Sequence, residues 1–158
     1  MYEEKLAFIK NDFFQLLSKI SAGTKANWGK MDAQHMVEHV AAFFKVSTEK
    51  IKFDLVTPEE HLPKYREFLF SDKQFRENTK APATVIGEEP LPLRYGSYEE
   101  AVQKLHKAVH EFLTYFKNDT AKKTVHPVFG PLNFQEWTLL HYKHIRHHLR
   151  QFGVLEFK

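Results

Sequence analysis

The fold of this chain is decided by residues 133–153, which read NFQEWTLLHYKHIRHHLRQFG. No Gly or Pro interrupts the stretch before Gly153, and its apolar residues recur at helical spacing, so we expect one long amphipathic helix. Asn133, with Glu136 three residues later, predicts a capping box at the start of this helix. Gly153 predicts its end.

This helix holds four of the ten histidines of the chain within eight residues. At about 100° per residue, His141, His144 and His148 fall within roughly 60° of one another, whereas His147 turns off that face. A His-x3-His pair one turn apart can direct two imidazoles at one metal ion. Two ligands do not make a stable site, so the pattern requires a third ligand from elsewhere in the chain.

The same helix also carries cations. Lys143, Arg146 and Arg150 alternate with the histidines, so a phosphate-binding stripe is the competing interpretation. The helix lacks interleaved exposed aromatic residues and any clear nucleic-acid motif, and we expect these three side chains to form a solvated cationic rim.

The regions outside this helix predict further helices joined by long loops. Helical spacing indicates a helix over 2–20, a second from Asp32 as N-cap to about Glu49, a short one over 58–70, and a strong one that a capping box opens at Ser97 and Glu100 and that ends near Phe116. Residues 71–96 and 117–132 are expected to be loops, and 154–157 could form a stub of strand. We therefore expect an all-α fold, a four-helix bundle with long connecting loops, as one domain over residues 1–158.

Composition narrows the class of protein. The 158 residues carry a net charge of +3, with positive and negative side chains interspersed, which is typical of a solvated surface and not of a nucleic-acid footprint. The absence of cysteine excludes disulfides, Cys-ligated zinc and a protein thiol nucleophile. We see no signal peptide and no apolar run long enough for a membrane span, so we expect a cytoplasmic protein.

The second predicted helix offers two candidates for the third ligand. His35 and His39 are four residues apart and share one face. His39 lies among Met36, Val40 and Phe43, whereas His35 lies nearer the edge of this apolar face, which favours His39. The remaining histidines are expected in other roles: surface or boundary positions for His106 and His110, and exposed or structural positions for His61 and His126.

Three stretches resemble the DinB-like superfamily: residues 28–39, WGKMDAQHMVEH; residues 126–137, HPVFGPLNFQEW; and residues 144–153, HIRHHLRQFG. The last matches the pattern His-x2-His-His-x2-Gln of that superfamily, and the His-Pro-x-x-Gly loop is similar to one uncharacterised branch. The resemblance implies a four-helix bundle that holds a divalent metal (Zn, Ni or Fe) on three histidines. Carried over position by position, these ligands are His39, His144 and His148.

The resemblance also implies a chemistry. Relatives of this kind use low-molecular-weight thiols such as bacillithiol, so we expect a metal-dependent S-transferase that acts on a small-molecule substrate, with the cationic rim steering the anionic thiol. The alternatives are a metal-hydroxide hydrolase and a non-catalytic metal-binding stress protein. His141 would support a ligand from behind or line the cavity, and His147 would face outward or serve the structure. A homodimer is compatible with the 15 phenylalanines, without a face being singled out.

Overall fold

A computed structural model describes residues 2–77, 79 and 89–156 of the chain. The described part is mostly helical, with one small antiparallel sheet of two strands. The helices are α1 (Tyr2–Ala7), η1 (Phe8–Asp12), α2 (Phe13–Leu17), α3 (Ala33–Ser47), η2 (Glu59–His61), α4 (Leu62–Phe70), α6 (Tyr98–Phe116) and α7 (Phe134–Gln151). The strands are β1 (Thr124–His126) and β2 (Gly130–Leu132).

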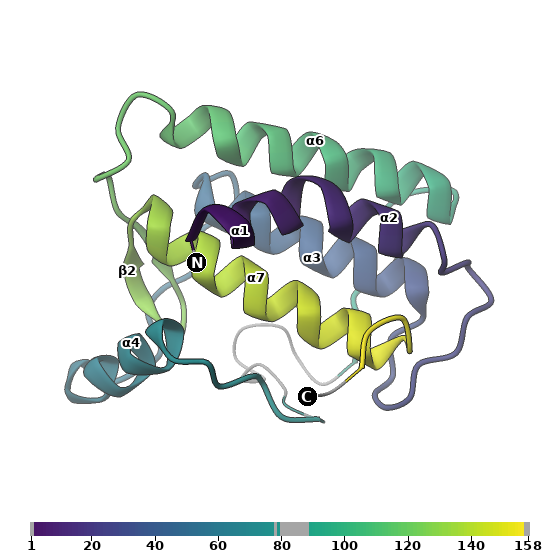
Figure 1. The fold of residues 1–158 in the computed structure, drawn as a ribbon, viewed down its shortest axis with the longest axis horizontal. Coiled ribbons are helices and arrows are strands. Elements are labelled where there is room, and N and C mark those ends of the chain that lie inside the picture. The colour runs from purple at the N-terminus through teal and green to yellow at the C-terminus, as the bar shows by residue number, and fades with distance from the viewer. Residues whose placement is uncertain (1, 78, 80–88, 157–158) are drawn as a thin grey trace.

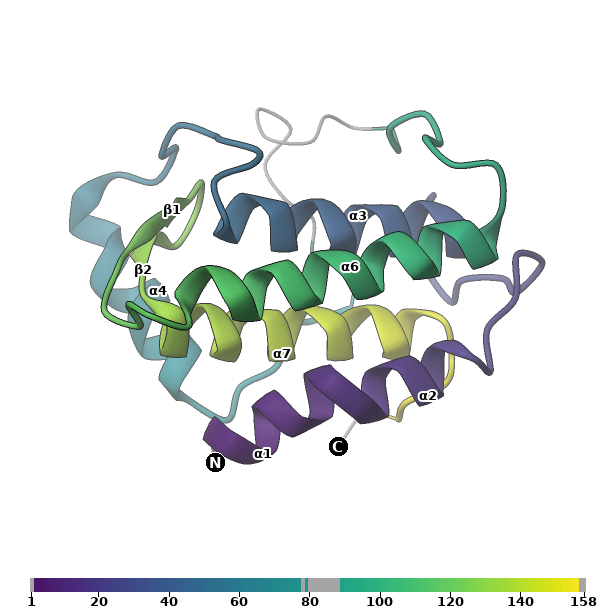
Figure 2. The ribbon, with the colours of Figure 1, turned by 90° about the horizontal axis from the view of Figure 1, so that it is seen from above.

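Four long helical segments lie side by side (Figures 1 and 2). They are α3, α6, α7 and the N-terminal segment that α1, η1 and α2 form without a break. The segment packs along α7, while α3 contacts both α6 and α7. Large side chains such as Phe13, Phe44, Phe112 and Trp137 are fully buried between them. Helix α7 buries residues on nearly every side, so it is the central helix of this fold.

Side-chain caps fix the helix boundaries where the sequence predicts them. The Asn133 side chain accepts from the Glu136 amide, and the Glu136 carboxylate accepts from the Asn133 amide, which completes the capping box of α7. The hydroxyl of Ser97 accepts from the Glu100 amide at the start of α6. Gly153 follows α7 with a φ of +78°, a left-handed conformation that Gly adopts without strain.

The prediction of a plain loop over 117–132 is wrong because β1 and β2 form a hairpin there; the fold is mostly helical, as predicted, with this one small sheet in addition. Its stability comes from contacts with distant helices. The Thr124 hydroxyl donates to the carbonyl of Ser47 at the end of α3 and accepts from the Trp137 indole of α7. The imidazole Nδ1 of His126 accepts the amides of Val128 and Phe129, which closes the turn.

The prediction of one regular helix over 2–20 also needs a correction. The described helix changes winding at η1, a π-helical turn in which the amide of Phe13 donates to the carbonyl of Phe8. Such a turn holds one more residue than an α-helical turn. Apolar spacing alone does not reveal it, because Ile9, Phe13 and Leu17 are buried at intervals that suit either winding.

The other predicted segments agree with the structure as far as it describes them. Residues 59–70 are helical as η2 and α4. The described parts of 71–96, residues 71–77, 79 and 89–96, contain no helix or strand, and the rest of that predicted loop, including Pro82 and Gly87, lies outside the described residues. Residues 154–156 are not a strand, and Phe157 also lies outside. Among the described helices, none combines the length and the apolar character needed to cross a membrane.

Candidate metal centre

Three of the predicted histidines converge from two facing helices. His39 lies in the middle of α3, and His144 and His148 lie one turn apart in the second half of α7. The Nε2 atom of His144 is 3.0 Å from that of His39 and 3.1 Å from that of His148. One ligand atom from each of the three lies within 4.8 Å of the others. The structure therefore brings together the set that the sequence predicts.

The packing of the two helices explains why these rings meet. Helix α3 buries Met36 and Val40 against the core, which turns its His39 face toward α7. The ring of Phe43 stands edge-on to both His39 and His144, with centroids 5.2 and 5.5 Å away. The Phe43 ring thus packs against two of the three imidazoles.

A hydrogen-bonded chain fixes the tautomer of His148. The side-chain amide of Gln151 donates through Nε2 to the backbone carbonyl of Trp28, at 2.9 Å. Its Oε1 atom therefore faces His148 Nδ1, at 2.7 Å, and this nitrogen must be the N–H donor. The Nε2 lone pair of His148 is left directed at the cluster, as outer-shell partners commonly arrange for a metal-binding His.

No placement of protons on the three Nε2 atoms gives a hydrogen bond in both Nε2–Nε2 contacts. Nε2 of His148 carries no proton. If Nε2 of His144 is protonated, its N–H can point at His148, and then no hydrogen bond joins His144 to His39. Without that proton, the lone pairs of His144 and His148 face each other at 3.1 Å. A divalent cation would accept all three lone pairs, and the separations are close to the roughly 3.3 Å between nitrogens around tetrahedral zinc. The donor set therefore fits a metal ion.

The electrostatics favour neutral imidazoles. Burial, reinforced by the neighbouring His148, holds the pKa of His39 well below its usual value. The pKa of His144 is lowered in the same way, first by burial and then by His148 and His39. Burial lowers the pKa of His148 to about 4, against the opposing hydrogen bond with Gln151. At neutral pH the three rings are thus deprotonated and free to act as ligands.

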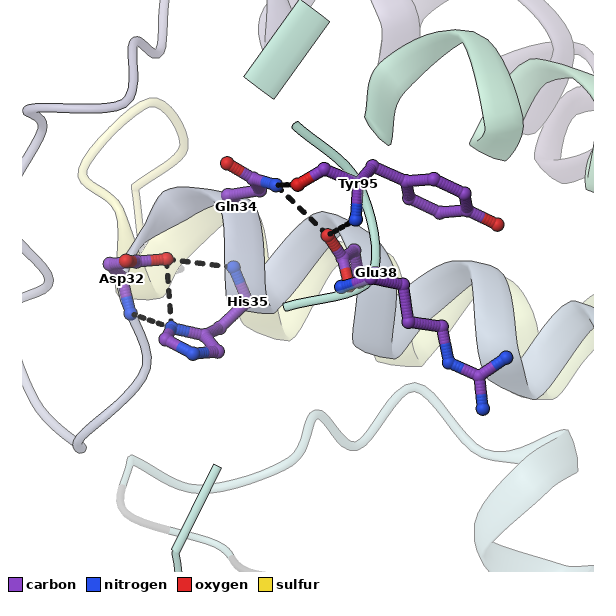
Figure 3. Close-up of polar contacts among 6 residues, drawn as sticks. Asp32, Gln34, His35, Glu38 and Tyr95 are labelled. Carbon is purple, nitrogen blue, oxygen red and sulfur yellow. Dashed lines mark hydrogen bonds and ion pairs between the residues drawn. The ribbon is translucent and has the colours of Figure 1, made fainter. Parts of the chain in front are cut away.

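His35, the alternative to His39, has a different role at the start of α3 (Figure 3). Its backbone amide donates to the Asp32 carboxylate at 2.7 Å, and its Nδ1 accepts from the Asp32 amide at 3.4 Å. His35 is therefore the N3 partner of a capping box, a position usually taken by Glu or Gln.

The carboxylate next to the cluster in sequence is also engaged elsewhere (Figure 3). Glu38 accepts from the backbone amides of Arg94 and Tyr95, at 2.8 and 3.3 Å. Gln34 donates to both Glu38 and the Tyr95 carbonyl. These contacts attach the segment before α6 to α3, so the role of Glu38 in the described structure is to anchor a loop.

The two other histidines of α7 are core residues. His141 is 1% exposed and stacks on Phe44, with centroids 3.8 Å apart, and on Trp137. It packs in the aromatic core beside Phe44. His147, expected to face outward or serve the structure, is buried with its ring against Trp28 and Phe75, so its role is structural.

The histidines outside α3 and α7 take no part in the cluster. His61, His106 and His110 are exposed, and His106 stacks on Phe14. His126 is buried, and burial lowers its pKa to about 3, so of the two predicted roles the structural one holds.

The expected cationic rim is wrong. Lys143 and Arg150 are 7% and 2% exposed, and Arg146 is half-buried. The Lys143 ammonium donates to the carbonyls of Ser71 and Lys73. Arg146 lies about 160° around α7 from both His144 and His148. These cations therefore do not surround the histidine cluster.

Two residues of the site have roles that the sequence interpretation missed. Gln151 belongs to the quoted C-terminal pattern, but its function depends on the Trp28 carbonyl, 123 residues away. Gly29 has a φ of +84°, and a Cβ atom there would lie 2.8 Å from Gln151 Nε2. The sequence shows both the Trp28-Gly29 pair and Gln151, but their spacing does not reveal that they lie together in the structure.

The chain belongs to the family described as "Protein of unknown function (DUF1569)", whose profile matches residues 74–154, just over half of the chain. The match covers α6, the hairpin and α7 with His144 and His148, whereas His39 precedes it. No curated protein and no solved structure matches the chain. None of these comparisons concerns the DinB-like superfamily, so that resemblance stays a prediction from sequence.

Proposed function

We propose that the protein is a metal-dependent enzyme, a four-helix bundle of the DinB-like type that holds a divalent ion on His39, His144 and His148. The observation that carries the proposal is the convergence of three Nε2 atoms from α3 and α7. Three neutral imidazoles leave the ion its full positive charge and at least one open position, as in catalytic zinc sites. Zn, Ni and Fe(II) all suit this ligand set.

The chemistry that we propose is transfer of a low-molecular-weight thiol of the bacillithiol type to an electrophile. A bound divalent ion lowers the pKa of a coordinated thiol or water. In the reaction a sulfur–carbon bond forms, the leaving group departs with its electron pair, and the thiol proton passes to solvent. The absence of cysteine from the chain is compatible with this chemistry, since the thiol would come from a small molecule. The resemblance supplies the thiol class.

Metal-hydroxide hydrolysis is the second candidate, and it would need a general base near the ion. Within the described residues, the cluster contains only imidazoles. Glu38, the nearest carboxylate in sequence to His39, accepts from two loop amides and one glutamine. This favours thiol chemistry over hydrolysis by a Glu38 base. A non-catalytic metal-binding stress protein is the third candidate, and the activity assay below separates it from the other two.

The metal site is tested by elemental analysis of the purified protein after zinc or nickel loading. We expect a stoichiometric amount of metal in the wild-type protein and background amounts in His148→Ala. His106→Ala is the matched control, because His106 is exposed and lies outside the cluster. Equal metal content in wild type and His148→Ala would overturn the site.

The chemistry is tested on the loaded protein with bacillithiol and a chloro-dinitro aromatic. We expect a rate above that of the thiol alone, and loss of this excess in His148→Ala. Metal bound at stoichiometry with no excess rate would contradict the S-transferase function while leaving the site intact. Ester hydrolysis without thiol would then favour the hydrolase, and absence of both activities a binding protein.

A further inference from the structure

A strongly basic cavity lies apart from the histidine cluster. It has a volume of about 160 Å³ and is formed where α1, the segment after α4 and α7 meet. Five cationic residues line it: Lys5, Lys73, Lys143, Arg146 and Arg150. Among its lining residues, the single carboxylate is that of Asp72. This excess of positive charge distinguishes the cavity from a random gap between helices.

Two cations of this cavity, Lys143 and Arg146, are held in place by their contacts. The ammonium group of Lys143 has three donors, and the carbonyls of Ser71 and Lys73 use two of them. The guanidinium of Arg146 packs on the rings of Phe8 and Tyr142, 5.8 and 5.2 Å from their centroids. Positions fixed in this way reduce the entropy lost when a ligand binds.

Three of these cations form no ion pair with a described carboxylate, although Asp72 lies in the same cavity. Within the described part of the chain, no ion pair joins Lys5, Lys73 or Arg146 to a carboxylate. Burial, and then Lys5, lower the pKa of Lys143 to about 8, although Asp72 opposes the shift. Burial and the neighbouring Arg146 also lower the pKa of Arg150. An anion in the cavity would relieve this crowding of positive charge.

We propose that this cavity binds a phosphate group, through the charges of Lys5, Lys143 and Arg146. A phosphate accepts several charge-assisted hydrogen bonds at once, and clustered Arg and Lys donors are the side chains that supply them. The cavity volume of about 160 Å³ is large enough for one phosphate group. None of the three proposed ligands is among its lining residues, and Arg146 lies about 160° around α7 from His144 and His148, so this site is separate from the proposed metal centre.

The test is calorimetric titration of the metal-free protein with inorganic phosphate, against potassium chloride at matched ionic strength. We expect saturable phosphate binding and at least about a tenfold weaker affinity in Arg146→Gln and in Lys5→Gln, as expected for loss of one charged hydrogen bond. Lys19→Gln, which removes an exposed cation of the same terminal region, should bind as the wild type does. Circular dichroism checks that each variant is folded.

The proposal would be overturned by no heat beyond that of chloride, by unchanged affinity in both cavity variants, or by equal weakening in Lys19→Gln. His148→Ala should bind phosphate as tightly as the wild type, and loss of binding there would place phosphate at the histidines instead. A phosphomonoester such as glycerol phosphate, titrated in parallel, shows the source of the group. Tighter binding than inorganic phosphate indicates a phosphorylated metabolite, and weaker binding the free ion.

Discussion

At the scale of single residues, Gln151 orients a ligand of the candidate metal centre without being a ligand itself. A carbonyl can only accept, so the Trp28 carbonyl leaves the Gln151 amide one orientation, and this orientation sets the proton of His148 on Nδ1. The sequence pattern contains this glutamine without revealing its role.

Replacing Gln151 tests this role. In Gln151→Leu we expect a metal affinity about 10- to 100-fold lower than in the wild type, the usual cost of losing an outer-shell partner. Gln151→Glu keeps an acceptor for His148 but sets a carboxylate oxygen against the Trp28 carbonyl, so its affinity should lie between those of the wild type and Gln151→Leu. Competition with a chromophoric chelator measures both. An affinity unchanged in Gln151→Leu would show that His148 needs no such partner.

Buried neutral histidines make the protein sensitive to acid. Burial holds the pKa of His141 well below the usual value and lowers that of His126 to about 3. Because the folded-state pKa lies below that of the unfolded chain, about 6.5, the contribution of each residue to stability is complete above pH 6.5 and is lost as the pH falls toward the folded value.

The variant His141→Phe should reduce this sensitivity. It removes one titrating group from the aromatic core while keeping the contacts with Phe44 and Trp137. Between pH 6.5 and 4, we expect the free energy of unfolding to fall less steeply, by up to about 1.4 kcal/mol per pH unit. Urea unfolding at several pH values gives this slope. The same slope in both proteins would mean that His141 titrates alike in the folded and unfolded chain.

At the scale of elements, the segment between α2 and α3 is attached to the end of α7. The Asn27 amide donates to the Gln151 carbonyl at 2.7 Å, and the Asn27 side chain donates to the Arg150 carbonyl. Gly29 allows this approach because of its positive φ and its missing Cβ.

Gly29→Ala should therefore disturb both the backbone and the site. The left-handed conformation costs a non-Gly residue about 1–3 kcal/mol, and the new methyl group would displace Gln151. We expect lower thermal stability together with weaker metal binding. Gly23→Ala is the matched control, because its Cβ would meet no atom within 4 Å. Equal effects of the two substitutions would refute the role of Gly29.

Local signals predict the helices well and the connections poorly. Asp32, Ser97 and Asn133 cap the helices that they predict, because a cap depends on neighbours within one turn. The hairpin after α6 depends instead on Ser47, which is distant in sequence, and on Trp137, which follows the loop. Likewise, periodicity placed His144 and His148 on one face, but it could not show that Lys143 and Arg150 are buried.

At the scale of the whole molecule, the candidate centre joins helices whose ligands His39 and His144 lie 105 residues apart. A metal ion that binds the folded but not the unfolded chain stabilises it by about 2.7 kcal/mol at a free concentration 100 times Kd. We therefore expect zinc to raise the melting temperature of the wild type and not that of His148→Ala. An equal rise in both would mean that the ion binds elsewhere.

The π-helical turn η1 has a consequence for how length changes can be absorbed near the N-terminus. Ile9, Phe13 and Leu17 repeat every four residues, and in a regular α-helix such a repeat drifts by about 40° at each step. The wider turn opposes this drift and keeps the strip facing α7. Phe8, at its first residue, also lies under Arg146. A one-residue deletion within Phe8–Asp12 would therefore turn η1 into an ordinary α-helical turn and leave α1 close to its present orientation, with Lys5 still at the basic cavity.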